Sequence, residues 1–293
     1  MPELHLLPAQ PGVFFSEQDH KYFHCGQETI EVPSSSRIIA LGGGKDFDKE
    51  PWRKSLGRKG LSAMGAEYFM ERVRDIRAAI GTQEHAAIAC GLGIPDERTK
   101  GGFCAEAAAI HAQWFERVLP RIGKVYIIEE PMIHPGGCYG FTPDLVAEVD
   151  GILTLCDWKT NQAEHFAERY KRLIDFMPED EIMRGICEHL AEVDAAAGRT
   201  REATARVRDG WQMQQGSYAF GLEAVHGFRV ERGINFMLSV DGVKEKCWNR
   251  PDLEQGWLQF AGGLLLHHQR AVMAGGHPVF QAALNALYPL MRS

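Results

Sequence analysis

The chain has 293 residues, 45% of them hydrophobic and 24% charged, a composition typical of a folded globular protein rather than a disordered one. Its formal net charge of -7, from 32 basic and 39 acidic side chains, argues against a protein that coats nucleic acid with its whole surface, although a local basic groove stays compatible with it. No apolar run reaches the roughly 18 residues that a membrane-spanning helix needs, so we expect no membrane partner.

The cysteines and the first residues bear on the cellular compartment. Seven cysteines are scattered along the chain without a CxxC pair, and an odd count in a long chain argues against a disulfide framework. The opening MPELHLLPAQPG lacks the cationic start and long apolar core of a signal peptide. We therefore expect reduced thiols and a cytoplasmic location.

The N-terminal half predicts a small β element followed by helices. Residues 12–40 contain strand formers and then the serines of PSSSRIIAL, which are good N-cap residues for a turn of helix. Residues 50–118 are predicted to be mostly helical. Within them, residues 103–119 form an alanine-rich amphipathic pattern that Pro120 stops. Residues 124–131, KVYIIEEP, predict a strand that ends at a proline.

The C-terminal half predicts two hairpins separated by helices. The expected elements are a hairpin over 142–160, charged Ala-rich helices over 161–210, a helix over 211–226, strands over 229–240 and 243–248, and a helix over about 252–274. The whole order predicts a single α/β (α+β) domain with a central mixed β-sheet flanked by helices on both faces.

The first hairpin sets two aspartates against each other. Asp150-Gly151 is the strongest two-residue turn signal in the chain, and the sixth residue pair counted outward from it is Asp144 with Asp157. Directly opposed side chains lie about 4.5–5.5 Å apart at Cβ, where like charges are destabilising. By the two-residue period of a strand, Lys159 shares the face of Asp157, whereas Trp158 points to the other side.

Two carboxylates held together must bind a cation, share a proton or be separated by sheet twist. A lysine on the same face favours a hard divalent ion and phosphate hydrolysis, because Mg²⁺ is typically held by one or two carboxylates, water and phosphate oxygens. The alternative interpretation is a solvated pair of aspartates near strand ends, with Lys159 as a surface lysine.

The same residues resemble the PD-(D/E)XK nuclease signature, in Pro143-Asp144 and Asp157-Trp158-Lys159. The resemblance implies a restriction-endonuclease-like core. The EEP at 129–131 is similar to the acidic residue before the core hairpin in RecB-type members, with Glu129 preferred by spacing and Glu130 left open.

Further segments extend the resemblance over most of residues 20–248. AAAIHAQWFE resembles the helix that carries a metal-binding histidine, which would be His111, and QQGSYAFGLEAVHG resembles the QxxxY helix, with Gln214 and Tyr218. These last two are four residues apart and share a helical face. The segment from Lys21 to Ile39 is similar to the N-terminal element of phage and mitochondrial genome-maintenance exonucleases.

The chain also departs from the family pattern. Ala108-Ala109 stands where the family has a small residue and threonine before the histidine, and residues 165–210 form a probable helical insertion. Its stretch 199–208, RTREATARVR, predicts either a phosphate contact or a solvated helix surface. The cysteine trio that holds an iron–sulfur cluster in some relatives is missing after Cys247, so no cluster is expected.

The resemblance implies a metal-dependent DNA exonuclease. Asp144, Asp157 and the Trp158 backbone carbonyl would hold Mg²⁺ or Mn²⁺ with His111 as an extra ligand, and Lys159 would orient the attacking water. Glu129 joins the catalytic set.

Further positions are expected to contact DNA. These are Gln214 and Tyr218, and in the cluster WRKSLGRKG also Arg53 and Lys54, although that cluster equally suits a plain solvated helix.

The implied substrate is DNA that is single-stranded or has a free end, in the cytoplasm of a bacterium or phage-infected host, during recombination or repair and with a recombination partner protein. The alternatives are a structure-selective endonuclease, a catalytically idle nuclease fold that binds nucleic acid or protein, and a phosphoesterase acting on small nucleotides.

Overall fold

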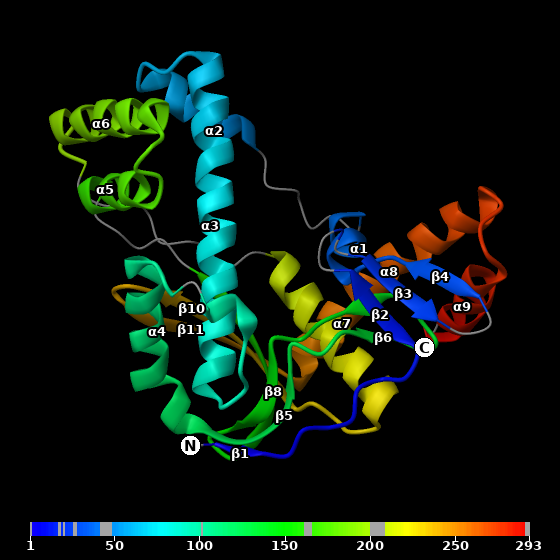
Figure 1. Cartoon of the computed structure of the whole chain (residues 1–293). Coiled ribbons are helices and arrows are strands. Elements are labelled where there is room, and N and C mark those ends of the chain that lie inside the picture. The colour runs from blue at the N-terminus through cyan, green and yellow to red at the C-terminus, as the bar shows by residue number, and fades with distance from the viewer. Residues whose placement is uncertain are drawn as a thin grey trace.

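A central mixed sheet with helices on both faces organises the molecule (Figure 1). The computed structural model describes residues 2–16, 19, 21–25, 28–41, 49–100, 102–160, 166–199 and 209–290. The central sheet has the order β1 (Glu3–Leu4), β5 (Ile122–Ile128), β8 (Leu145–Val149), β9 (Ile152–Thr160), β10 (Arg232–Ser239) and β11 (Gly242–Asn249). The pairs β1–β5 and β9–β10 are parallel, and the other neighbours are antiparallel, as the predicted mixed sheet requires.

Both faces of the sheet are buried, and alternate residues of each strand supply the two cores. Leu145 and Ala147 of β8 belong to the core under α3 (Ala63–Gly91) and α4 (Ala105–Arg117). Val146, between them, belongs to the opposite core under α7 (Asp209–His226) and α8 (Arg250–Met273). Because both faces are covered, the strands are near-continuous apolar runs, and a polar residue within them stands out.

A smaller sheet packs beside the second core. It consists of β2 (Val13–Ser16), β3 (Lys21–Cys25) and β4 (Thr29–Val32), and leads into α1 (Ser35–Leu41). The short pair β6 (Met132–Ile133) and β7 (Gly140–Phe141) lies under it. At Gly140 a Cβ would stand 2.0 Å from Cγ of Tyr22, so only glycine permits this approach. The contact places Tyr22 next to the start of the first hairpin.

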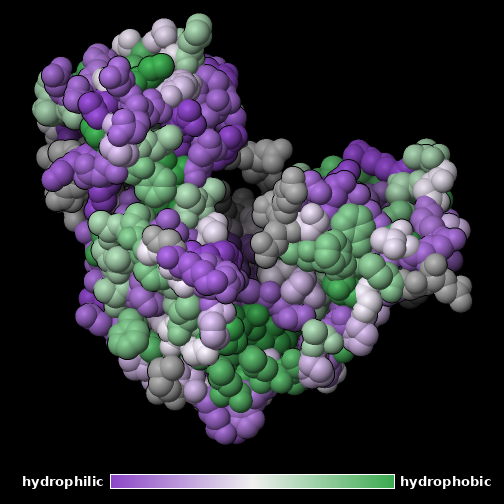
Figure 2. Space-filling view, viewed as in Figure 1, coloured by the Kyte–Doolittle hydropathy of each residue, from purple (hydrophilic) through white to green (hydrophobic). Residues whose placement is uncertain are grey.

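An arm of helices projects away from the sheet (Figure 1). The long helix α3, with 29 residues and a length of roughly 44 Å, carries α2 (Lys49–Arg58), α5 (Phe166–Phe176) and α6 (Glu181–Ala196) near its N-terminal end. Lys59 Nζ, 2.7 Å from the buried Asp194 Oδ2, ties this end of α3 to α6. Figure 2 shows an open hollow between the arm and the rest of the body.

Most predicted elements are present with shifted ends. The helix expected at 252–274 is α8, and the hairpin strands expected at 229–240 and 243–248 are β10 and β11. Helix α4 ends at Arg117, before Pro120, because a short 3₁₀ turn accommodates the proline. Helix α9 (Pro278–Leu290) was not among the expected elements. Within the described ranges, no helix is both long and apolar enough to cross a membrane.

Candidate active site

The hairpin of β8 and β9 brings the two aspartates together. Its turn residues Asp150 and Gly151 have φ of 53° and 76°, and five residue pairs follow in the predicted register. The ladder stops at Leu145, one step short of the predicted pair of Asp144 with Asp157. There the main-chain pairing is replaced, because the N–H of Trp158 donates to Asp144 Oδ2 at 2.7 Å.

Asp157 is only 1% exposed, and donors from neighbouring elements fix its carboxylate. Lys159 Nζ, on the same face of β9, lies 2.8 Å from Oδ1, and Gln214 Nε2 of α7 donates to the same oxygen at 3.1 Å. Asn235 Nδ2 of β10 donates to Oδ2 at 2.7 Å, and its own Oδ1 accepts from Trp248 Nε1 of β11 at 2.6 Å. The carboxylate therefore has one orientation, set by the sheet and by α7.

A second cluster lies against Asp144. His85 of α3 donates through Nδ1 to Glu129 Oε1 at 2.7 Å, and the same nitrogen lies 3.9 Å from Asp144 Oδ1. Arg98 holds the other oxygen of Glu129. Glu129 follows β5 with a left-handed φ of 46°, and its N–H donates to the Asp144 carbonyl, so this backbone turn places its side chain beside the aspartate.

The charges in this cluster shift each other's protonation. Burial and the neighbouring Asp157 raise the pKa of Asp144 to about 6, against the opposing effects of His85 and Lys159. Burial lowers the pKa of His85, but Asp144 and Glu129 outweigh it and raise the pKa to about 9. For Glu129, burial acts to raise the pKa, and His85 and Arg98 together bring it below its ordinary value. An imidazolium therefore lies between two carboxylates near neutral pH.

Hydroxyl groups border the site on the α7 side. Gln214 Nε2 donates to the Tyr218 hydroxyl at 3.2 Å, as expected for two side chains four residues apart on one helical face. Ser35 of α1 also hydrogen-bonds this hydroxyl, and burial raises the pKa of Tyr218 to about 12. The Tyr22 hydroxyl pairs with Thr142 Oγ1 at 2.8 Å, two residues before Asp144.

His111, the histidine expected to bind metal, lies elsewhere. Its ring stacks on Trp114 and Phe103, with centroids 5.5 and 6.4 Å away, and its Nδ1 is 3.9 Å from the buried Glu84. His85 takes the place beside Asp144 that the sequence interpretation gave to His111. The structure thus brings His85, and not His111, next to Asp144. Gly81-Thr82 precedes His85 in α3, which is the small residue and threonine that the resemblance leads one to expect before a histidine.

Arg53 and Lys54, two of the predicted DNA contacts, lie far from the carboxylates. Arg53 pairs with Glu50 and, at 2.7 Å, with Glu67, and Lys54 is an exposed lysine 3.7 Å from Glu50. Glu67 and His85 are 18 residues apart on one helix, which corresponds to about 27 Å along its axis. Of the stretch 199–208, all but Arg199 lies outside the described residues.

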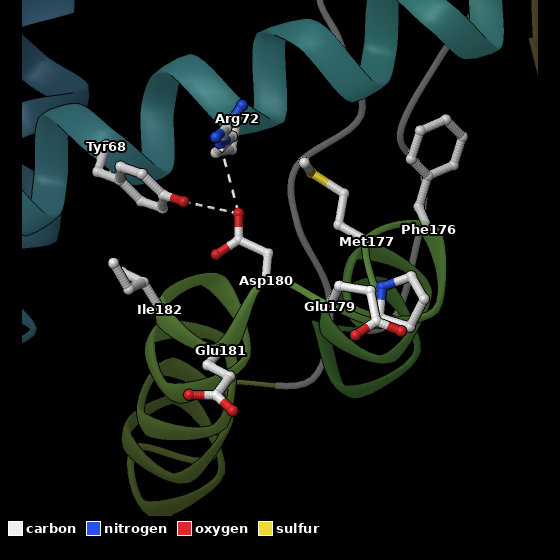
Figure 3. A pocket seen from close by; sticks show the side chains of 9 residues that line it. Tyr68, Arg72, Phe176, Met177, Glu179, Asp180, Glu181 and Ile182 are labelled. Carbon is white, nitrogen blue, oxygen red and sulfur yellow. Dashed lines mark hydrogen bonds and ion pairs between the residues drawn. The ribbon is translucent and has the colours of Figure 1, made fainter.

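A separate pocket of about 630 Å³ lies between α3 and the start of α6 (Figure 3). Asp180 is at its centre: Oδ2 accepts from the Tyr68 hydroxyl at 2.6 Å and lies 3.4 Å from Arg72 Nε, while Oδ1 caps α6 through the N–H of Met183. Because Asp180 is fully engaged in joining α6 to the arm, this pocket has a structural explanation and is distinct from the carboxylate site.

The carboxylate oxygens around Asp144 suit a hard cation, but the protein side chains alone would not complete its coordination shell. In the described part of the chain, no group of three or more His, Cys, Asp or Glu side chains is gathered so that it could hold a metal by itself. Both oxygens of Asp157 already accept hydrogen bonds, whereas Asp144 Oδ1 accepts none from the described residues and lies 3.9 Å from His85 Nδ1. Mg²⁺ needs as few as one or two protein carboxylates, with water and phosphate oxygens completing its shell, so the residues fit such an ion.

Comparison with protein-family models finds no match, and comparison with curated proteins finds no relative.

Proposed function

We propose that this chain is a metal-dependent deoxyribonuclease of the PD-(D/E)XK superfamily. The observation that carries the proposal is the pair of aspartates at the open end of one hairpin, Asp157 buried and Asp144 half-buried, with Lys159 Nζ 2.8 Å from Asp157 Oδ1. Lysine and two carboxylates on one small surface combine cation binding with a donor for a phosphate or a water molecule. A lysine and two carboxylates do not contribute to apolar packing between two buried cores, so packing does not explain this combination.

Asp144, Asp157 and the Trp158 carbonyl would hold the cation. The N–H and C=O of one residue point to the same side of an extended strand, so the Trp158 carbonyl faces the side from which its N–H reaches Asp144. His85, rather than His111, supplies the nearby imidazole. A bound Mg²⁺ or Mn²⁺ would polarise the scissile phosphate and lower the pKa of a water molecule.

The remaining side chains act by position. Lys159 is held by Asp157 at rest and would orient the attacking water or offset charge on the phosphate. Glu129 and Arg98 keep His85 in place, and Gln214 and Tyr218 line the α7 side, where an amide and a phenol can hold a phosphate or a base.

The natural substrate in this proposal is DNA with a free end or a single strand, in the reducing cytoplasm of a bacterium or a phage-infected host, with a recombination protein as partner. One observation favours a second candidate, an idle nuclease fold that only binds nucleic acid: hydrogen bonds already occupy both Asp157 oxygens.

The test is cleavage of end-labelled linear and closed circular DNA, single- and double-stranded, with Mn²⁺, Mg²⁺ or EDTA. We expect wild-type protein to degrade linear DNA only with metal, and Lys159→Ala to lower the rate at least about 100-fold. Lys244→Ala, an exposed lysine on β11, is the matched control and should cleave normally.

Other outcomes separate the alternatives. Cleavage of closed circles indicates an endonuclease, and turnover of mononucleotides alone indicates a small-molecule phosphoesterase. If wild type and Lys159→Ala bind DNA equally and neither cleaves it with either metal, the nuclease proposal is wrong and the binding module is the better description.

A further inference from the structure

A second polar pocket lies beside α1. It has a volume of about 620 Å³ between β4, α1, α8 and the start of α9, and its lining includes Glu31, Arg37, Leu41, His267, Arg270 and Phe280. His267 and His268 are adjacent in α8 and have different surroundings. His268 is buried with its Nε2 2.7 Å from the Gly137 carbonyl, whereas His267 lines this pocket.

Two arginines make the pocket basic. Arg37 of α1 and Arg270 of α8 are exposed, and neither side chain has a hydrogen-bond or ion-pair partner among the described residues. Arg121 and Arg250, by contrast, are each bonded to two acidic side chains. Arg37 and Arg270 therefore line the pocket without a counter-charge from any residue that the structure describes.

The remaining charges do not cancel them. Glu31 is the acidic residue in the lining, and its Oε2 is 2.9 Å from Lys21 Nζ, so this pair is neutral and the two arginines leave a surplus of two positive charges. His267 lies within their field: burial, His268, Arg37 and Arg270 together lower its pKa to about 4. The positive charges of Arg37 and Arg270 thus favour the neutral form of the His267 imidazole.

The chemistry of the pocket selects a phosphate group. The planar fork of arginine matches two phosphate oxygens, and two arginines on separate helices can hold one phosphate from both sides. The ring of Phe280 adds an aromatic surface on which a base can stack. A free inorganic anion cannot stack on this ring, so the lining favours a phosphate that belongs to a nucleotide chain.

Helix α1 connects this pocket with the carboxylate site. Ser35 in its first turn hydrogen-bonds Tyr218, and Arg37 follows two residues later on the pocket side. The helix has seven residues and a length of roughly 10 Å, so a strand could contact both ends of it. We propose that Arg37 and Arg270 bind a backbone phosphate of a nucleic-acid strand, away from the scissile bond, and so guide that strand to Asp144 and Asp157. This inference rests on the proposed nuclease function for the identity of the strand.

The test measures binding without cleavage. A fluorescent single-stranded oligonucleotide with a 5′-hydroxyl, and hence no terminal phosphate, is titrated in EDTA with wild-type protein and with Arg37→Ala/Arg270→Ala. We expect the double variant to bind about 10- to 100-fold more weakly and the plot of log affinity against log salt to flatten by about one to two units. Arg229→Ala, an exposed arginine paired with Glu231, is the control and should bind like wild type.

The outcomes separate this inference from the nuclease proposal. If wild type cleaves DNA while the double variant binds with unchanged affinity and salt dependence, the nuclease function stands and the phosphate pocket is refuted. If no protein cleaves DNA but the double variant loses binding, the pocket stands and the nuclease function fails. Displacement of the oligonucleotide by micromolar inorganic phosphate would identify a site for a small free anion and would also overturn the inference.

Discussion

Replacement of Asn235 tests whether the candidate site is fixed by the sheet as the distances indicate. Asn235 is fully buried and joins two groups, because its Nδ2 donates to Asp157 and its Oδ1 accepts from Trp248. In Asn235→Ala the bond to the carboxylate is lost, a cost of about 1.5–3 kcal/mol, and the buried Trp248 N–H loses its partner at a further cost of about 1–3 kcal/mol. We expect the free energy of unfolding to fall by about 3–5 kcal/mol.

The assay is urea unfolding in EDTA, followed by tryptophan fluorescence. Trp248→Phe replaces the indole by a smaller aromatic ring without the N–H, so it should cost about 1–3 kcal/mol, and a double-mutant cycle with Asn235→Ala should give a coupling energy of about 0.5–3 kcal/mol. Asn285→Ala, on the exposed surface of α9, should change stability by less than about 0.5 kcal/mol. A loss below about 1 kcal/mol for Asn235→Ala, or additive effects in the cycle, would refute the hydrogen-bonded connection from Asp157 through Asn235 to Trp248.

Two further predictions concern the framework around the site. In Gly216→Ala a Cβ would stand 2.3 Å from the backbone nitrogen of Trp257, so we expect α7 and α8 to be forced apart and about 3 kcal/mol of stability to be lost. Gly262→Ala is the control: a Cβ there has no atom within 4 Å, so this variant should be neutral or stabilising in the same denaturation assay. Burial lowers the pKa of His134 to about 4, and its Nδ1 accepts from the Gly137 N–H at 2.7 Å. The folded pKa lies below the unfolded value near 6.5, so up to about 3 kcal/mol should be present above pH 6.5 and lost as pH falls toward 4, and pH-dependent unfolding of His134→Asn should lack this loss.

The hairpin could be predicted because its information is local. An Asp-Gly turn at 150–151 with apolar residues on either side fixes the register, and five predicted pairs are present. The same count placed Asp144 near Asp157 with Lys159 beside it. The sequence could not show that the ladder ends one residue early and that the Asp144 side chain takes over the N–H of Trp158, because this depends on how β5 turns at its end.

The histidine shows where local reasoning fails. His85 and His111 both lie on long helices with small apolar neighbours, and helical periodicity alone does not say which helix end reaches the carboxylates. That choice depends on tertiary structure: α3 contacts β9, whereas the ring of His111 stacks on Trp114 of its own helix. A small residue and threonine before His85 were a usable signal.

The role of Asn235 in the site could not be predicted from the sequence, for a different reason. Its contact with Asp157 spans 78 residues and depends on the parallel pairing of β9 with β10, in which the two residues are direct partners. Parallel strands need a long connection, and here it contains α5, α6 and α7. No turn in such a connection sets the register, so the polar residue could not be assigned to the site from its position in the chain.

The energetic cost of the site is itself an argument about its purpose. Burying a carboxylate costs several kcal/mol unless it is paired, and buried ion pairs can often be replaced by apolar residues with no loss of stability. Asp144 keeps a pKa near 6, so its ionised form is less favourable where it stands than it would be in water. Groups from α3, α7, β9 and β10 converge to offset this cost. Apolar residues would close this end of the β8–β9 hairpin without the cost of burying charge, so stability alone does not explain two aspartates there. This cost favours the proposed function, because a phosphodiester with its divalent cation would need both carboxylates.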